Sequence, residues 1–164
     1  MKRAGLVTAA VVVSGALLAG CAGGPKAPPE KLDTGALAQQ VSASERAFAK
    51  TMADRDLAGF GQYVAEDALF YSGPTPPLRG RQAVMDHWKR FYDKPQAPFS
   101  WEPDQVVVLD NGTLAHSAGP VKDPSGKVVG RFNSVWRQDA PGVWRVVFDR
   151  GETVCDCEKN EMKP

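Results

Sequence analysis

The sequence predicts an α+β domain in which helices come first and a meander of strands follows. Two segments, 34–52 and 81–92, repeat apolar residues at the spacing of a helix. From residue 99 onward, short runs rich in β-branched and aromatic residues alternate with turns of Gly, Asn, Asp and Pro. Helices segregated from strands in this way are typical of a fold in which the helices cover one face of a sheet.

The first twenty residues are typical of a secretory signal peptide. Lys2 and Arg3 precede an uncharged stretch rich in Ala, Val and Leu, residues 4–20. A transmembrane anchor is the alternative, but this stretch is shorter than the about 20 apolar residues that a bilayer needs. We therefore predict a signal peptide over residues 1–20.

The end of this segment carries a candidate lipidation site. The string "LAGC", ending at Cys21, resembles the bacterial lipobox. That resemblance implies cleavage just before Cys21 and diacylglycerol on its thiol. Ala22 rather than Asp follows the cysteine, which by the same resemblance indicates the outer membrane. We expect an exported protein, held by lipid at the periplasmic face of the outer membrane.

Composition divides the rest of the chain into three parts. Residues 21–33 are rich in Gly, Pro and Lys and contain almost no large apolar group, so they predict a flexible tether. The folded domain is expected over 34–152, and a C-terminal tail over 153–164.

Three helices are expected in the first half of the domain. The first begins near Thr34, with Asp33 or Thr34 as its cap, and its apolar stripe contains Leu37, Val41, Phe48 and Met52. A shorter helix, capped by Asp56, is predicted in the string "DLAGFGQYVAED", which its two glycines weaken. The third covers 81–92, and its apolar stripe is centred on Trp88.

The strands are expected between turn signals. A short strand in "ALFYSG" precedes the loop "PTPPLRG", whose three prolines exclude a central strand. Asn111-Gly112 separates two later strands, because both residues tolerate positive φ. The last two strands form a hairpin around residues 139–142.

This order of elements resembles the nuclear transport factor 2-like superfamily, which includes ketosteroid isomerases and SnoaL-like polyketide cyclases. The strings that carry the resemblance are "RDLAGFGQYVAEDALFYSG", "LRGRQAVMDHWKRFY" and "GRFNSVWRQDAPGVWRVVFDRG". It implies a cone: a curved antiparallel sheet wraps a long N-terminal helix, two further helices close it, and a pocket opens at the wide end. It also implies dimerisation through the convex face, so we expect a homodimer.

The chemistry of ketosteroid isomerases does not follow from this resemblance. Those enzymes use a carboxylate base and an oxyanion hole made by a Tyr and a protonated Asp. The matching positions here hold Ser72, Phe48 and Ser134, respectively. Phe donates no proton and Ser is a poor base near neutral pH. We expect that activity to be absent and lean against an enzyme.

His116 and Asp149 form the candidate catalytic pair, because a His beside a carboxylate titrates near neutral pH. The alternative is a structural His, with Asp149 paired to an Arg. On the family's template, both side chains point into the cone. The other side chains expected to line a ligand pocket are Tyr71, His87, Trp88, Ser134 and Trp136.

Strand alternation extends this template to the rest of the sheet. The residues expected to face the pocket are Leu114, His116, Ala118, Phe132, Ser134, Trp136, Val147 and Asp149. The residues expected to face outward are Val135, Trp144, Val146 and Phe148.

Charge and sequence motifs argue against several classes of partner. Without the signal peptide the chain carries 18 basic and 19 acidic side chains and no basic block, which argues against nucleic acid. No cofactor motif is present, and two histidines without a nearby acidic cluster argue against a metal. Cys155 and Cys157 would meet an oxidising compartment, which favours a disulfide over two free thiols. The expected partners are the membrane and a small-molecule ligand, bound by a binding or accessory protein; a small hydrolase, isomerase or cyclase is the alternative.

Overall fold

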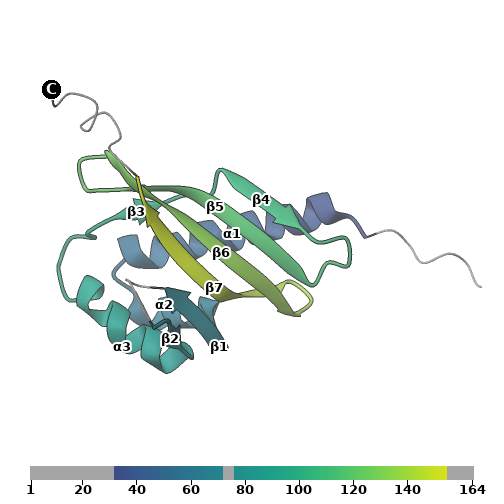
Figure 1. The fold of residues 1–164 in the computed structure, drawn as a ribbon, viewed down its shortest axis with the longest axis horizontal. Coiled ribbons are helices and arrows are strands. Elements are labelled where there is room, and N and C mark those ends of the chain that lie inside the picture. Colours follow the sequence, from purple (N-terminus) through teal and green to yellow (C-terminus); the bar gives the residue numbers. More distant parts are fainter. Residues whose placement is uncertain (1–31, 72–75, 155–164) are drawn as a thin grey trace, which may run out of the picture. The chain divides into compact units, whose positions relative to one another are not determined.

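A computed structural model describes residues 32–71 and 76–154 of the 164-residue chain. Within these residues three helices pack on a curved, mixed sheet of seven strands, as Figure 1 shows. The predicted α+β class is therefore confirmed. The signal peptide, Cys21, most of the tether, Ser72 and the pair Cys155–Cys157 lie outside the described residues, and those expectations stay predictions.

Helix α1, Thr34–Ala53, lies along one face of the sheet (Figure 1). The Asp33 side chain caps it by accepting a hydrogen bond from the Ala36 N–H at 2.9 Å, which satisfies one of the free donors of the first turn. Its buried stripe contains Val41, Phe48 and Met52, as the periodicity predicts. It also contains Glu45, which is fully buried and which the apolar pattern does not include.

The two other helices follow the sequence prediction closely. Helix α2, Leu57–Tyr63, is capped by Asp56, whose carboxylate accepts from the Gly59 N–H at 2.8 Å. Helix α3 covers Arg81–Tyr92 and buries the stripe centred on Trp88 against the core. Within the residues that the structure describes, no helix is long and apolar enough to cross a membrane.

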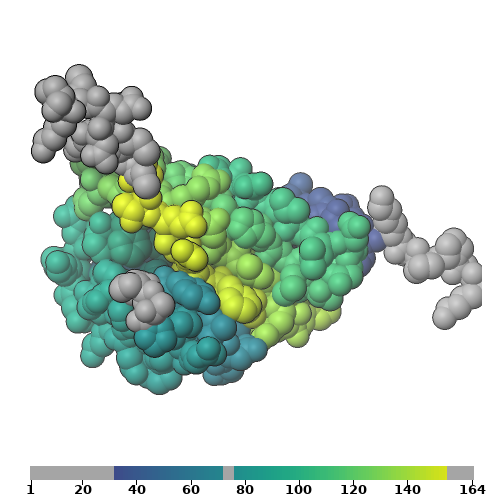
Figure 2. All heavy atoms as spheres, viewed as in Figure 1, coloured from purple at the N-terminus to yellow at the C-terminus, as the bar shows by residue number. Residues whose placement is uncertain are grey.

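The sheet has the strand order β2-β1-β7-β6-β5-β3, and β4 also pairs with β5. The strands are β1 (Val64–Tyr71), β2 (Leu78–Arg79), β3 (Ser100–Trp101), β4 (Gln105–Val108), β5 (Leu114–Lys122), β6 (Val128–Ala140) and β7 (Val143–Thr153). One pairing departs from the expected antiparallel sheet: β1 runs parallel to β7, which crosses the face seen in Figure 2 as a yellow band. A further departure is β2, two residues of the predicted loop that pair with the edge of β1.

Glycines allow two features of this sheet. Gly112 and Gly142 have φ of +70° and +74°, in the turns that the sequence predicts. At Gly119 in β5, a Cβ atom would lie 1.9 Å from the carbonyl oxygen of Glu102. Only a glycine lets the segment after β3 approach so closely.

A bulge in β7 decides which side chains point inward. Val135 pairs with Phe148, but Trp136 pairs with Val146, so Val147 has no partner of its own. The extra residue shifts the alternation, and Trp144 and Val146 face the core with exposures of 3% and 0%. The expectation that these two face outward is therefore wrong. Phe148 does face outward and is 45% exposed.

The facing of β5 also differs from the prediction by one residue. Ser117 pairs with Ser134, which pairs with Asp149, whereas His116 pairs with Val135, which pairs with Phe148. A slip of one residue moves every side chain of a strand to the opposite face. Ala115 and Ser117 therefore face the core, while Leu114, His116 and Ala118 belong to the outer side.

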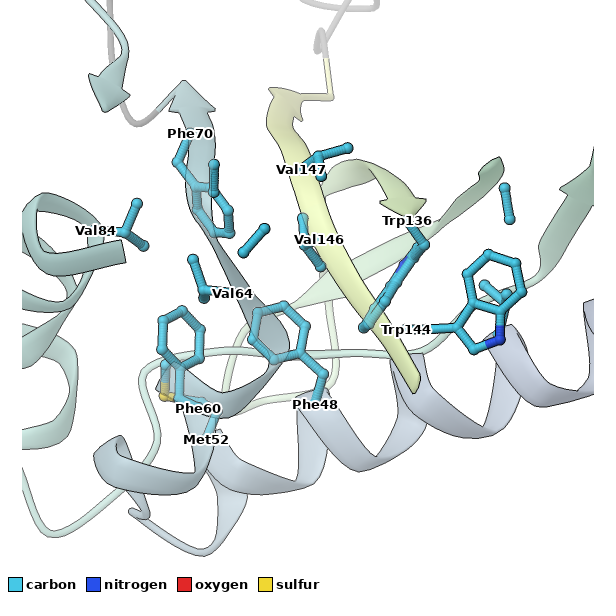
Figure 3. Packing of buried hydrophobic residues seen from close by; sticks show 14 of the residues in the cluster. Phe48, Met52, Phe60, Val64, Phe70, Val84, Trp136, Trp144, Val146 and Val147 are labelled. Carbon is cyan, nitrogen blue, oxygen red and sulfur yellow. The ribbon is translucent and has the colours of Figure 1, made fainter. Parts of the chain in front are cut away.

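The core lies between the sheet and the three helices (Figure 3). Phe48 of α1 stacks on Phe60 of α2 with ring centroids 4.7 Å apart, and its edge meets Trp136 of β6 at 5.9 Å. Phe60 stacks in turn on Trp88 of α3 at 4.7 Å. This chain of rings joins all three helices to the sheet.

Candidate functional site

A pocket of about 410 Å³ opens at one end of the core, between α1, α3 and the sheet. Its size is within the range of sites for small organic molecules, about 300–1,000 Å³. Its walls are mostly aromatic rings, which come from helices and strands far apart in the sequence. The lining residues are Phe48, Tyr71, Trp88, Arg90, Phe91, Phe99, Trp101, Val121, Phe132, Asp149 and Gly151.

Four of the lining rings form a continuous wall. Trp88 and Phe91 of α3 meet edge to face at 5.6 Å, and Phe91 meets Phe99 in the same way at 5.2 Å. Trp101 of β3 closes the group, 6.0 Å from Phe99 and 6.4 Å from Trp88. Edge-to-face contacts of this kind fix the ring planes, so the wall keeps its shape without a ligand.

Asp149 of β7 is the carboxylate of this pocket. It is half-buried, and the Ser134 hydroxyl donates a hydrogen bond of 2.8 Å to its Oδ2. Burial raises the pKa of Asp149 to about 7; the Ser134 hydrogen bond lowers it, and the charge of Glu45 raises it further. A carboxyl group with such a pKa exchanges its proton near neutral pH.

Glu45 lies behind the pocket, in a buried cluster of four polar side chains. The Trp101 indole N–H donates to its Oε1 at 2.8 Å, and the Trp136 indole N–H donates to its Oε2 at 2.8 Å. The Ser117 hydroxyl donates to Oε2 at 2.5 Å. Burial raises the pKa of Glu45 above its usual value, and these hydrogen bonds from Ser117, Trp101 and Trp136 lower it. No cation lies in this cluster, so hydrogen bonds alone satisfy the carboxylate.

Arg90 and His87 of α3 lie at the rim. Arg90 lines the pocket, is exposed, and has its guanidinium 4.6 Å from the centroid of the Phe91 ring. Its Nη2 is 2.8 Å from His87 Nε2. Burial lowers the pKa of His87, and so does the charge of Arg90. The indole N–H of Trp88 is buried and has no acceptor among the described residues.

Only some of the residues that the sequence analysis assigned to the ligand pocket lie in its wall. Tyr71, Trp88 and Asp149 lie in the pocket wall. Ser134 and His87 do not line the pocket themselves: Ser134 is buried and donates to Asp149, and His87 contacts Arg90 of the rim. The remaining two residues require correction.

Trp136 and His116 do not lie in the pocket. Trp136 is fully buried in the core, where Glu45 accepts its indole N–H. His116 points to the outer face, since it pairs with Val135 and not with Ser134. His116 and Asp149 therefore occupy opposite faces of the sheet, and the predicted catalytic pair is wrong.

Sequence reasoning missed Glu45, Phe99 and Trp101. A signal for Glu45 existed: it follows Val41 by four residues and precedes Phe48 by three, so it falls on the apolar stripe of α1. A carboxylate at a core position requires buried donors, and the two tryptophans that supply them are far away in the sequence. Phe99 and Trp101 belong to the part of the chain, from residue 99 onward, where strands are predicted. No feature of the neighbouring sequence indicated that their side chains would line a pocket.

The arrangement supports binding and proton exchange. An aromatic wall offers apolar area to a flat molecule, and Asp149 accepts or donates one hydrogen bond according to its protonation. Among residues 32–71 and 76–154, no three His, Cys, Asp or Glu side chains gather where they could hold a metal ion.

Comparison with known proteins gives the same fold. The family model of the SnoaL-like domain matches residues 45–147. No curated protein matches the chain. A nuclear transport factor 2-like protein of unknown function from Pseudomonas putida is similar, with a TM-score of 0.61 and 20% identity over 79% of this chain and 98% of that one. A ketosteroid isomerase-like protein from Erwinia carotovora atroseptica has a TM-score of 0.56 and 13% identity over 72% of this chain and 96% of that one.

The raised pKa of Asp149 predicts how stability depends on pH. A carboxyl group whose pKa is higher in the folded state stabilises the fold fully below its unfolded pKa, and that contribution is lost as pH rises toward about 7. Asp149→Asn keeps an acceptor for Ser134 and removes the ionisation. We expect the two proteins to have the same free energy of unfolding at pH ~4. At pH ~8 the variant should be more stable than the wild type by about 1–4 kcal/mol. Urea unfolding at both pH values measures this difference in stability. A variant that is stabilised equally at the two pH values would contradict the prediction.

Proposed function

Because the chain belongs to the SnoaL-like domain family, we propose that it binds a small, flat and largely apolar molecule in the aromatic pocket. The observation that carries the proposal is the combination of an aromatic wall with one carboxylate, Asp149. Apolar walls with a few convergent polar groups are the usual composition of a ligand site, because the walls supply binding energy and the polar groups fix orientation.

Acid–base catalysis at Asp149 is the second candidate. It is favoured by a pKa of about 7, which suits a general acid or base at neutral pH. Since His116 points to the other face, this carboxyl group would act without a histidine. Phe48 lines the same pocket where a ketosteroid isomerase would use a tyrosine, which leaves that particular chemistry without its hydroxyl donor. Binding is therefore the function that we put first.

We further propose that the domain is held at the periplasmic face of the outer membrane by lipid on Cys21. The support is the lipobox-like string after an apolar segment. Each buried methylene of a lipid chain contributes about 0.8 kcal/mol, so several chains together give stable attachment. A homodimer also stays a prediction, and the outer face that bears His116 and Phe148 is where a second copy would pack.

Gly151 offers a test of the pocket. It lines the pocket, and a Cβ atom added there meets nothing within 4 Å. Gly151→Leu should fill the site without disturbing the core. We expect the neutral probe naphthalenemethanol to quench tryptophan fluorescence of the full chain, and Gly151→Leu to weaken its binding by about tenfold or more, the loss of about 1.4 kcal/mol of contact.

The matched control is Arg150→Leu, which places the same side chain on the opposite face of β7. Arg150 is exposed and pairs with Asn133 on the outer side. This variant should bind the probe as the wild type does. Equal binding by wild type and Gly151→Leu would show that the probe does not use the pocket, and the proposed function would fail.

Lipidation has its own test. Metabolic labelling with palmitate should mark the wild type and not Cys21→Ala, because the thiol is the proposed attachment point. Gel fluorography after immunoprecipitation reads the result. Label that survives the substitution would contradict the anchor.

A further inference from the structure

The Asp149 carboxylate has no cationic partner in the part of the chain that the structure describes. Its only hydrogen bond there comes from Ser134, and it takes part in none of the ion pairs of residues 32–71 and 76–154. Other aspartates do pair with arginines, as Asp67 does with Arg137 at 2.9 Å and Asp104 with Arg131 at 2.5 Å. The carboxylate inside the pocket is thus left to pair with something that enters from outside.

Among the described residues, the surroundings of Asp149 supply hydrogen-bond donors and ring faces but no buried positive charge. Glu45 lies behind it, in a cluster whose members donate hydrogen bonds but bring no positive charge. The walls are aromatic, and the face of an aromatic ring carries the negative part of its quadrupole. A positive group that enters the pocket meets attraction from the floor and from the walls together.

Arg90 is the one cationic side chain among the residues that line the pocket. It is exposed at the rim and lies over the Phe91 ring at 4.6 Å, so it does not neutralise the floor. Its position shows that the aromatic wall already holds a cation on one ring. A cation over a ring face is attracted by the ring quadrupole, and more strongly where water is excluded.

We propose that the pocket selects an organic cation: a protonated amine on a flat apolar body, with its ammonium group on Asp149 and the body against the rings of Trp88, Phe99 and Trp101. The inference rests on the proposed binding function and specifies its ligand class. An anionic molecule would bring its charge toward Asp149 and Glu45, with only the exposed Arg90 to compensate. A neutral molecule would fill the apolar walls but leave the carboxylate unpaired.

The experiment compares three probes of one shape: naphthylmethylamine, naphthalenemethanol and naphthoic acid. Calorimetric titration of the full chain at neutral pH should give an order of affinity of amine, then alcohol, then acid. We expect the amine to bind about tenfold or more tightly than the alcohol, since a charge-assisted hydrogen bond is about twice as strong as a neutral one. Asp149→Asn should remove this preference and leave the alcohol's affinity within about twofold, because only the ammonium loses its charged partner.

Asp86→Asn is the control for charge. Asp86 is an exposed carboxylate on α3 that does not line the pocket, so this variant should keep the preference for the amine. An alcohol or acid that binds as tightly as the amine would overturn the proposed class, and so would a preference that survives Asp149→Asn. The Gly151→Leu test with the neutral probe decides separately whether the pocket binds ligands, so the two proposals fail in different experiments.

Discussion

The buried carboxylate of Glu45 is the interaction on which the rest of this structure depends. It lies in the middle of α1, fully excluded from solvent, and its hydrogen bonds reach Trp101 of β3, Ser117 of β5 and Trp136 of β6. An unpaired carboxylate in such a place would cost several kcal/mol, so the fold is favoured only when all these donors are present together. The helix is thereby fixed to the sheet in one position, and Trp101 is fixed where it closes the aromatic wall.

The same carboxylate connects the scaffold to the pocket. Ser117 and Ser134 are directly opposite each other on β5 and β6; the first donates to Glu45 and the second to Asp149. Burial is the main reason that the pKa of Asp149 is raised, and the charge of Glu45 adds to it. Asp149 thus lines the pocket while Glu45 lies behind it, and burial together with that second carboxyl group raises the pKa of the pocket floor.

Much of the fold could be predicted because its signals are local. Asp33 and Asp56 mark the starts of α1 and α2 as caps, the stripe around Trp88 defines α3, and Gly112 and Gly142 mark turns. What could not be predicted depends on contacts between distant strands. The bulge at Val147, the facing of His116 and the parallel pairing of β1 with β7 are matters of register, which no short window of sequence records. The candidate site could be predicted only in part for the same reason. Asp149, Tyr71 and Trp88 were identified from the sequence. The role of Glu45 could not be, because it depends on hydrogen bonds from Trp101 and Trp136, which lie far away in the sequence.

Titration of Asp149 itself reports whether a desolvated carboxyl group, with Glu45 behind it, forms the floor of the pocket. Carbon-13 NMR of the aspartate side chains in the full chain, with Asp149 assigned by its absence in Asp149→Asn, reports that pKa without any ligand. We expect a midpoint of about 7 for Asp149, and a lower midpoint in Glu45→Gln, where one source of negative charge is gone. A midpoint near the ordinary aspartate value of about 3.9 in the wild type would contradict it.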